Sequence, residues 1–226
     1  MNRKLVLLPA VAAFLATSAC ADGTVSGPTL DATRASSSAS AQSGLNLHPR
    51  GFGEASYAAW KAHEGQQDSR GQADMALYFQ KMTATTTNAA GVAEITGVAG
   101  MSLSEITGLS WEYRADGWCG ARAPRWTFIV VDASGDRGVI DLGCAAAVKS
   151  PGSQPIGWTK ASYPGVSPSL IIPLDAGFNA AEATISALYI IFDEGTDIPA
   201  NPGYVYLDNI TVNEKVFTSP ADNGSN

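Results

Sequence analysis

Hydrophobic and polar residues alternate with a period of two along several segments of the chain. In GLSWEYRAD, the side chains of Leu109, Trp111 and Tyr113 share one side, while Glu112 falls on the opposite side, where we expect solvent. This pattern predicts a half-buried β-strand. The segments RWTFIVVD and SALYIIFD are apolar on both parities, which predicts central strands that are covered on both sides.

Other segments extend the β pattern. ADMALYFQKM and SLIIP predict further strands, and RGVIDLGC predicts the return strand of a hairpin whose turn is DASGDRG. The segment EASYAAWKAHEG, residues 54–65, is the one candidate helix and fits a first strand equally well. About eight short strands separated by turn residues predict an all-β fold, a sandwich or a barrel.

The last predicted strand, in GYVYLDNITVN, contains a change of phase. Val205 and Leu207 share one parity, whereas Ile210 and Val212 share the other. A one-residue slip would turn the later side chains to the wrong face of the sheet unless an extra residue absorbs it. We therefore predict a β-bulge at Asp208–Asn209.

The N-terminal residues 1–19 have the features of a secretory signal peptide of the lipoprotein type. Two basic residues precede a short apolar run, which is too short for the roughly 20 residues that span a bilayer. The run ends in ATSAC, which resembles a bacterial lipobox and predicts acylation of Cys20 and a lipid bilayer as partner. The residue after it, Ala21, favours the outer membrane or the cell surface. Ordinary cleavage near Ala19 is the alternative.

Composition divides the rest of the chain. Residues 20–45 are rich in Ala, Ser, Thr and Gly, so we expect a lipid anchor followed by a flexible, disordered tether. Residues 46–218 are the length of one domain and are expected to form the β-sandwich. Residues 219–226 are expected to be a disordered tail.

Charge excludes one class of partner. Residues 1–19 contain two of the 14 basic residues and none of the 21 acidic ones, so the exported chain has 12 against 21, a net charge of −9. No cluster of Lys and Arg occurs in the sequence. Nucleic acid is therefore not expected as a partner, because phosphate contacts need such clusters.

Two cysteines remain after Cys20, and we predict that they form a disulfide. Cys119 and Cys144 flank the predicted hairpin, one before its first strand and one after its second. An exported domain is in an oxidising compartment, where such a pair is expected to be joined. Closing this loop stabilises the fold by about 3.5 kcal/mol. A metal-binding or reactive pair is the alternative, although no CxxC motif occurs.

Aromatic residues near Cys119 suggest a ligand site. Trp118, Arg122 and Trp126 lie in DGWCGARAPRW, and Trp158 and Tyr163 lie in SPGSQPIGWTKASYPGVSP, which we interpret as a long loop. Aromatic faces can stack on the apolar side of a sugar ring while Arg binds its hydroxyls. The alternative is structural, with Trp126 in the core and Trp118 over the disulfide.

The strands ITGLSWEYR and VYLDNITVN together resemble the jelly-roll β-sandwich of galactose-binding-like and carbohydrate-binding modules, and that of secreted bacterial lipoproteins with the same pattern. The resemblance implies an antiparallel jelly-roll sandwich and a structural calcium ion held by a carboxylate of the last strand. Asp208 is the matching position, with Glu54 and Asp74 as further candidates. The alternative is that Asp208 binds backbone N–H groups at the bulge.

The sequence lacks the parts of common active sites. Its two histidines, His48 and His63, are not accompanied by a G-x-S-x-G motif, which would indicate a Ser–His–Asp active site. A zinc site needs more N and S ligands than the sequence offers. We therefore expect a non-catalytic cell-envelope binding module, for glycan or another extracellular ligand. The alternatives are a polysaccharide-acting hydrolase or lyase on the same scaffold and a structural envelope protein.

Overall fold

The computed structural model describes residues 44–67, 74–154 and 156–223. The signal peptide, Cys20 and nearly all of the expected tether lie outside these residues. The described chain forms two antiparallel sheets, and its helical segments are five short 3-10 turns. No helix in the described ranges is long and apolar enough to span a membrane.

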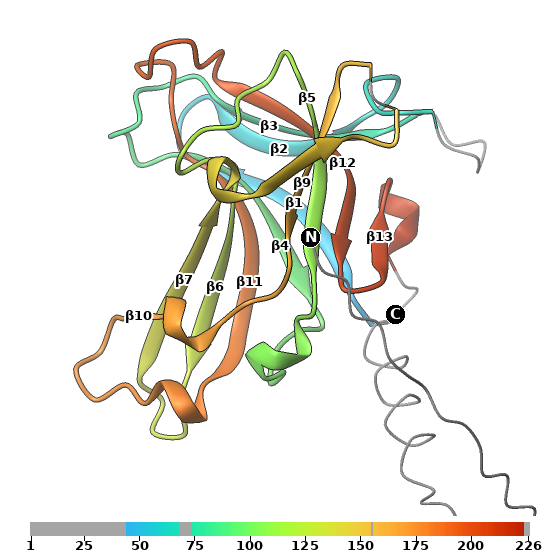
Figure 1. The fold of residues 1–226 in the computed structure, drawn as a ribbon. Helices are drawn as coiled ribbons and strands as arrows, with labels where there is room; N and C mark the ends of the chain where they lie inside the picture. Colours follow the sequence, from blue (N-terminus) through green and yellow to red (C-terminus); the bar gives the residue numbers. More distant parts are fainter. Residues whose placement is uncertain (1–43, 68–73, 155, 224–226) are drawn as a thin grey trace, which may run out of the picture.

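The first sheet, sheet A, contains six strands, seen in the lower part of Figure 1. Their order across the sheet is β1 (Asn46–Phe52), β4 (Ala90–Thr96), β11 (Thr184–Phe192), β6 (Arg125–Val131), β7 (Arg137–Gly143) and β10 (Ile172–Pro173). The β6–β7 hairpin is the one predicted from the sequence. Its turn is held by Asp132, whose Oδ1 accepts hydrogen bonds from the backbone N–H groups of Ser134 and Asp136.

The second sheet, sheet B, contains seven strands. Most of them lie in the upper part of Figure 1, and β13 lies lower, on the right. Its order is β2 (Ser56–Lys61), β3 (Ala76–Lys81), β12 (Tyr204–Val212), β5 (Leu109–Arg114), β9 (Trp158–Tyr163) and β8 (Val148–Pro151), and β13 (Lys215–Phe217) also pairs with β12. The chain crosses repeatedly between the two sheets. The antiparallel jelly-roll sandwich predicted from the sequence is thus confirmed, with thirteen strands in place of about eight.

The core lies between the sheets, and alternate residues of the strands point their side chains into it. Trp111 of sheet B stacks on Trp126 of sheet A with ring centroids 4.9 Å apart, and both side chains are fully buried. Alternation also places Leu77, Phe79, Val205 and Leu207 inward, where they join some twenty-five other apolar residues from strands and loops. The opposite parity of sheet B is consequently left to form an outer face.

The structure confirms the predicted bulge. The pairing of β12 with β5 shifts register between Asp208 and Thr211, and Asn209 has a positive φ of 46°. As a result Val205, Leu207, Ile210 and Val212 all face the core despite their change of parity. The extra residue therefore does what the hydrophobic pattern required.

Other expectations are corrected. The candidate helix at 54–65 contains strand β2. The long loop around Trp158 contains strand β9 and the last residues of β8, which is the edge strand of sheet B. The strands β1 and β4 were not predicted, because their small residues and the single proline, Pro49, give a weak periodic signal. The first part of the expected tail is folded onto the domain: Pro220–Asp222 is a 3-10 turn, and its cap Ser219 and its last residue Asp222 are both buried.

Candidate functional site

The aromatic wall predicted from the sequence does not form a shared surface. Trp126 is 0% exposed and lies in the core stack, Tyr163 is 6% exposed, and Trp158 is 8% exposed. The hydroxyl of Tyr163 is turned inward and donates to the carbonyl oxygen of Gly143 at 3.0 Å. These three side chains cannot stack on a ligand from solvent, because they face the sandwich interior or are covered at the surface.

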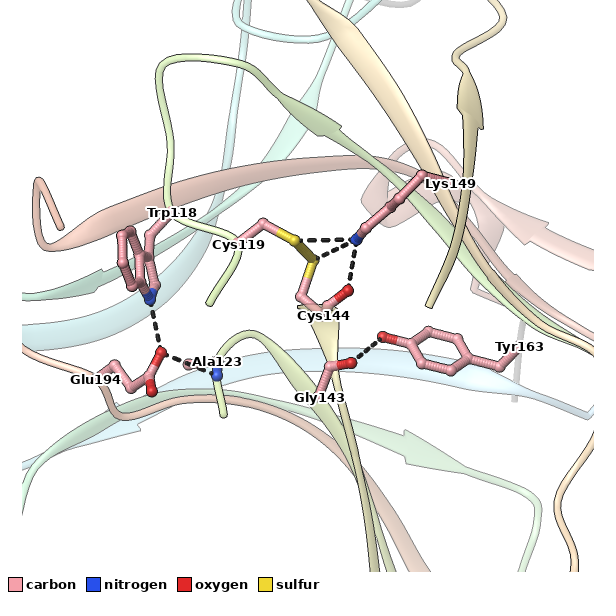
Figure 2. The surroundings of a disulfide bond; sticks show 8 residues. All are labelled: Trp118, Cys119, Ala123, Gly143, Cys144, Lys149, Tyr163 and Glu194. Atoms are coloured by element: carbon pink, nitrogen blue, oxygen red, sulfur yellow. Dashed lines mark hydrogen bonds between the residues drawn. A yellow bond between two sulfur atoms is a disulfide. The ribbon is translucent and has the colours of Figure 1, made fainter. Parts of the chain in front are cut away.

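The other two predicted ligand residues lie on the loop before β6. Trp118 is half-buried, and its Nε1 donates to Oε2 of Glu194 at 2.6 Å (Figure 2). The same oxygen accepts the backbone N–H of Ala123 at 3.2 Å, so Glu194 holds the loop at two points. Arg122 is exposed. A ligand role for Trp118 and Arg122 stays a prediction.

The predicted disulfide between Cys119 and Cys144 is confirmed, with 5.3 Å between the two Cα atoms. It ties the loop before β6 to the residue that follows β7. Figure 2 shows that Lys149 points its ammonium group at the bridge, a contact that no sequence pattern predicts. Cys144 is fully buried and Cys119 is half-buried.

Asp208 binds backbone groups at the bulge, as in the alternative to the calcium hypothesis. Its Oδ2 accepts the backbone N–H of Gln66 at 2.7 Å, and its Oδ1 accepts that of Asn209 at 2.6 Å. In the three described ranges, no group of three or more His, Cys, Asp or Glu side chains could hold a metal ion. A calcium ion with Glu54 or Asp74 as further ligands therefore stays a prediction.

Glu112 was expected to face solvent and is instead 2% exposed. It lies opposite Asp208 on the outer face of sheet B, where two loops cover it. Its carboxylate accepts hydrogen bonds from Gln66 Nε2 at 2.8 Å and from the backbone N–H and hydroxyl of Ser153, both at 2.6 Å. Loops thus cover the outer face of sheet B around Glu112 and Asp208.

Another part of the same face carries four tyrosines, which we call the tyrosine face: Tyr57 on β2, Tyr78 on β3, and Tyr204 and Tyr206 on β12. Tyr78 is central, with ring centroids 5.6 Å from Tyr57, 5.9 Å from Tyr204 and 4.7 Å from Tyr206. Tyr78 is 8% exposed, whereas the other three are half-buried. Their outward position follows from the register, because their strand neighbours face the core.

Charged side chains border the tyrosine face. The guanidinium of Arg114 lies 3.7 Å above the ring of Tyr206 and is paired with Glu64 at 2.6 Å and Asp116 at 2.7 Å. On the other side, the ammonium of Lys61 lies 5.4 Å from the ring centroid of Tyr57. The face therefore combines aromatic surface with donors and acceptors along its edges.

Burial and pairing change the ionisation of these groups. Burial, reinforced by the neighbouring tyrosines, raises the pKa of Tyr78 to about 12. Burial also raises the pKa of Tyr204, and nearby Asp116 adds to this effect. The hydrogen bonds from Arg114 lower the pKa of Asp116. At neutral pH these two tyrosines are therefore neutral hydrogen-bonding groups, and Asp116 is an ionised acceptor.

Sequence reasoning missed the tyrosine face because its residues come from three strands, one of which, β12, lies more than 100 positions after the other two. One signal was present, since Tyr204 and Tyr206 have the parity opposite to Val205 and Leu207. Two outward tyrosines on a predicted central strand would have marked this face. Their neighbours Tyr57 and Tyr78 could not be added without the pairing of β2, β3 and β12.

Comparison with known proteins gives structural neighbours only. No protein-family model matches the sequence, and neither does any curated protein. One similar structure is the family 11 carbohydrate-binding module of the cellulosomal cellulase Lic26A-Cel5E of Clostridium thermocellum, with 12% identity over 73% of this chain and 85% of that chain, and a TM-score of 0.41.

Two further structures come from the same organism. The family 11 module in complex with a β-1,3-1,4-mixed-linked tetrasaccharide has 11% identity over 76% of this chain and 89% of that chain, with a TM-score of 0.39. The family 30 module of the cellulosomal cellulase Cel9D-Cel44B has 12% identity over 74% of this chain and 98% of that chain, with a TM-score of 0.38. The tetrasaccharide is a ligand of the module in whose structure it is bound.

Proposed function

We propose that this protein is a non-catalytic glycan-binding module and that the tyrosine face is its binding surface. The observation that carries the proposal is the gathering of four tyrosines on the outer face of one sheet, three of them half-buried. Scattered exposed aromatic residues are common on proteins, but a contiguous patch on a rigid sheet indicates an interaction site.

The chemistry of the patch fits a sugar chain. The C–H side of a pyranose ring is apolar and packs against aromatic rings, while its hydroxyls need donors and acceptors at the rim. Arg114, Asp116 and Gln80 supply both kinds of group beside the rings. The surface is a sheet face and not a deep pocket, so it suits several units of an extended chain.

The test is binding to a panel of neutral and acidic polysaccharides, followed by variants. Tyr57→Ala and Tyr204→Ala each remove a half-buried ring and should weaken binding about tenfold or more. The matched control is Tyr189→Ala, because Tyr189 is a half-buried tyrosine of sheet A that also has an arginine, Arg50, over its ring. Equal effects of all three substitutions, or no binding to any member of the panel, would refute the proposal.

The same panel separates the alternative functions. New reducing ends or unsaturated products in the polysaccharide incubations would indicate a hydrolase or lyase, and the binding-only proposal would then be wrong. The complete absence of both binding and products would favour a structural envelope protein.

We further propose that the module is exported and held at the bacterial outer membrane or cell surface by lipid on Cys20. The support is the lipobox-like ATSAC at the end of the apolar N-terminal run. Full-length protein expressed in a Gram-negative host should partition into detergent, and Cys20→Ser should move it to the aqueous phase. Detergent partitioning that survives Cys20→Ser would refute acylation at this residue.

A further inference from the structure

We infer that the Cys119–Cys144 bridge is a thiol-exchange site that Lys149 activates, and that its reduction by a dithiol loosens the loop bordering the tyrosine face. The thiol exchange itself requires no glycan. A role of this exchange in regulating glycan binding rests on the proposed function.

Lys149 holds its charge directly against the bridge. Its Nζ lies 3.0 Å from Sγ of Cys119 and 3.3 Å from Sγ of Cys144, and it donates to the backbone oxygen of Cys144 at 2.5 Å (Figure 2). The ring of Tyr113 lies below it at 4.8 Å. Among the residues that the structure describes, no carboxylate forms an ion pair with Lys149. The ammonium group is thus available to a charge that develops on sulfur.

The two sulfurs differ in access, which sets the direction of attack. Cys119 is half-buried, whereas Cys144 is fully buried. An incoming thiolate therefore reaches Cys119 Sγ, forms a new S–S bond there and breaks the bond to Cys144. The electron pair of the broken bond leaves on Cys144 Sγ, next to the ammonium of Lys149. A leaving thiolate that is stabilised in this way leaves faster.

The second half of the reaction is supplied by the reductant. The other thiolate of the dithiol attacks its own sulfur in the mixed disulfide, closes an intramolecular disulfide and releases Cys119 as a thiolate, which takes a proton from water. The dithiol is oxidised by two electrons, and the cysteine pair is reduced by two. Loss of hydration through burial lowers the pKa of Lys149 to about 8, so the ammonium group remains mostly protonated at pH 7.

The bridge is linked to the tyrosine face through the loop before β6. Trp118, next to Cys119, donates its backbone N–H to the carbonyl oxygen of Tyr204 at 2.8 Å. Asp116, at the start of the same loop, accepts from Arg114 at 2.7 Å and from the hydroxyl of Tyr204 at 3.3 Å. Breaking the bridge removes the covalent tie of this loop to the end of β7, so these contacts are expected to open more often.

The first experiment measures reduction kinetics. Full-length oxidised protein in a Cys20→Ser background is exposed to dithiothreitol at pH 7, and free thiols are trapped with a maleimide over time. Lys149→Met and Lys149→Gln should be reduced roughly three- to tenfold more slowly than the parent. Lys149→Arg, which keeps the charge, should stay within about twofold. Arg50→Gln, which removes a positive charge from exposed β1, should have no effect.

Equal reduction rates for the parent and both neutral variants, with circular dichroism showing native folds, would overturn the activation by Lys149.

The second experiment compares backbone hydrogen exchange in the oxidised and reduced forms. Residues 115–120 and 203–206 should exchange at least about tenfold faster after reduction, while β6 serves as the internal control. Unchanged exchange would overturn the link to the tyrosine face. Neither readout uses a glycan, so failure here is distinguishable from failure of the proposed function.

Discussion

Removal of the Cys119–Cys144 disulfide should destabilise the domain by an amount that the loop length sets. The two residues are separated by 25 positions. Closing a loop of that size lowers the entropy of the unfolded chain by about 12 cal/mol/K, which corresponds to about 3.5 kcal/mol at 25 °C. Domains of this size have a free energy of unfolding of about 5–15 kcal/mol, so this one bond accounts for a large share of the total.

The assay is urea unfolding of Cys119→Ala/Cys144→Ala against the oxidised parent, both in a Cys20→Ser background so that no third thiol can exchange. With a slope of about 2 kcal/mol per molar urea, the midpoint should fall by about 1.7 M. Tryptophan fluorescence and far-UV circular dichroism should give the same midpoint if the unfolding remains two-state.

The slope of the free energy of unfolding against urea concentration is the control for this reasoning. The loss of a cross-link expands the unfolded chain, so the slope should stay equal or rise slightly. A loss of stability below about 1 kcal/mol with an unchanged slope would refute the entropic reasoning. It would mean that the unfolded chain already keeps the β6–β7 hairpin closed.

Three further predictions concern pH, the core and the bulge. Burial raises the pKa of Tyr163, and it raises that of Tyr78 to about 12, whereas tyrosines in the unfolded chain titrate near 10. Their contribution to stability is therefore complete below about pH 10 and is lost as the pH rises through about 12. The urea midpoint should fall over this pH range, and less steeply in Tyr163→Phe; a midpoint that does not change with pH would contradict the assignment. Trp126→Ala removes one partner of the fully buried 4.9 Å stack and should cost about 3–5 kcal/mol in urea unfolding, whereas a cost below about 1 kcal/mol would show that Trp126 is not a core residue. Asp208→Ala leaves the backbone N–H groups of Gln66 and Asn209 without this acceptor and should cost about 2–4 kcal/mol in urea unfolding. The control is Glu214→Ala, which truncates an exposed carboxylate just after β12; equal costs would argue against a special role of the bulge carboxylate.

Periodicity was sufficient to predict the sandwich and the bulge. The change of phase after Leu207 required an extra residue, and the structure places it at Asp208–Asn209. The disulfide followed from the position of its cysteines on either side of a predicted hairpin. These features depend on neighbours that are close in sequence or on a simple pairing, which is why a single sequence contains enough information.

The candidate site could not be predicted in the same way. Trp126 and Tyr163 were interpreted as ligand residues on the basis of type and loop composition, yet their strand parity directs them into the core. Glu194, in a segment that reads as a turn, is buried because it accepts the indole N–H of Trp118. The tyrosine face depends on pairing between strands more than 100 positions apart, which residue type and periodicity do not specify.

The 3-10 turn Pro220–Asp222, which precedes Asn223, has a consequence for self-association. Strand β1 is the outermost strand of sheet A, so its outer backbone groups would otherwise be open to pairing with another chain. The side chain of Asn223 pairs with one of these residues, Leu47. Its Oδ1 accepts the backbone N–H of Leu47 at 2.7 Å, and its Nδ2 donates to the Leu47 carbonyl oxygen at 3.0 Å. The carboxamide of Asn223 thereby makes the hydrogen bonds that a neighbouring strand would make. A chain shortened before Asn223 would leave these backbone groups of β1 unpaired at the edge of the sheet, where they could pair with another chain and promote aggregation.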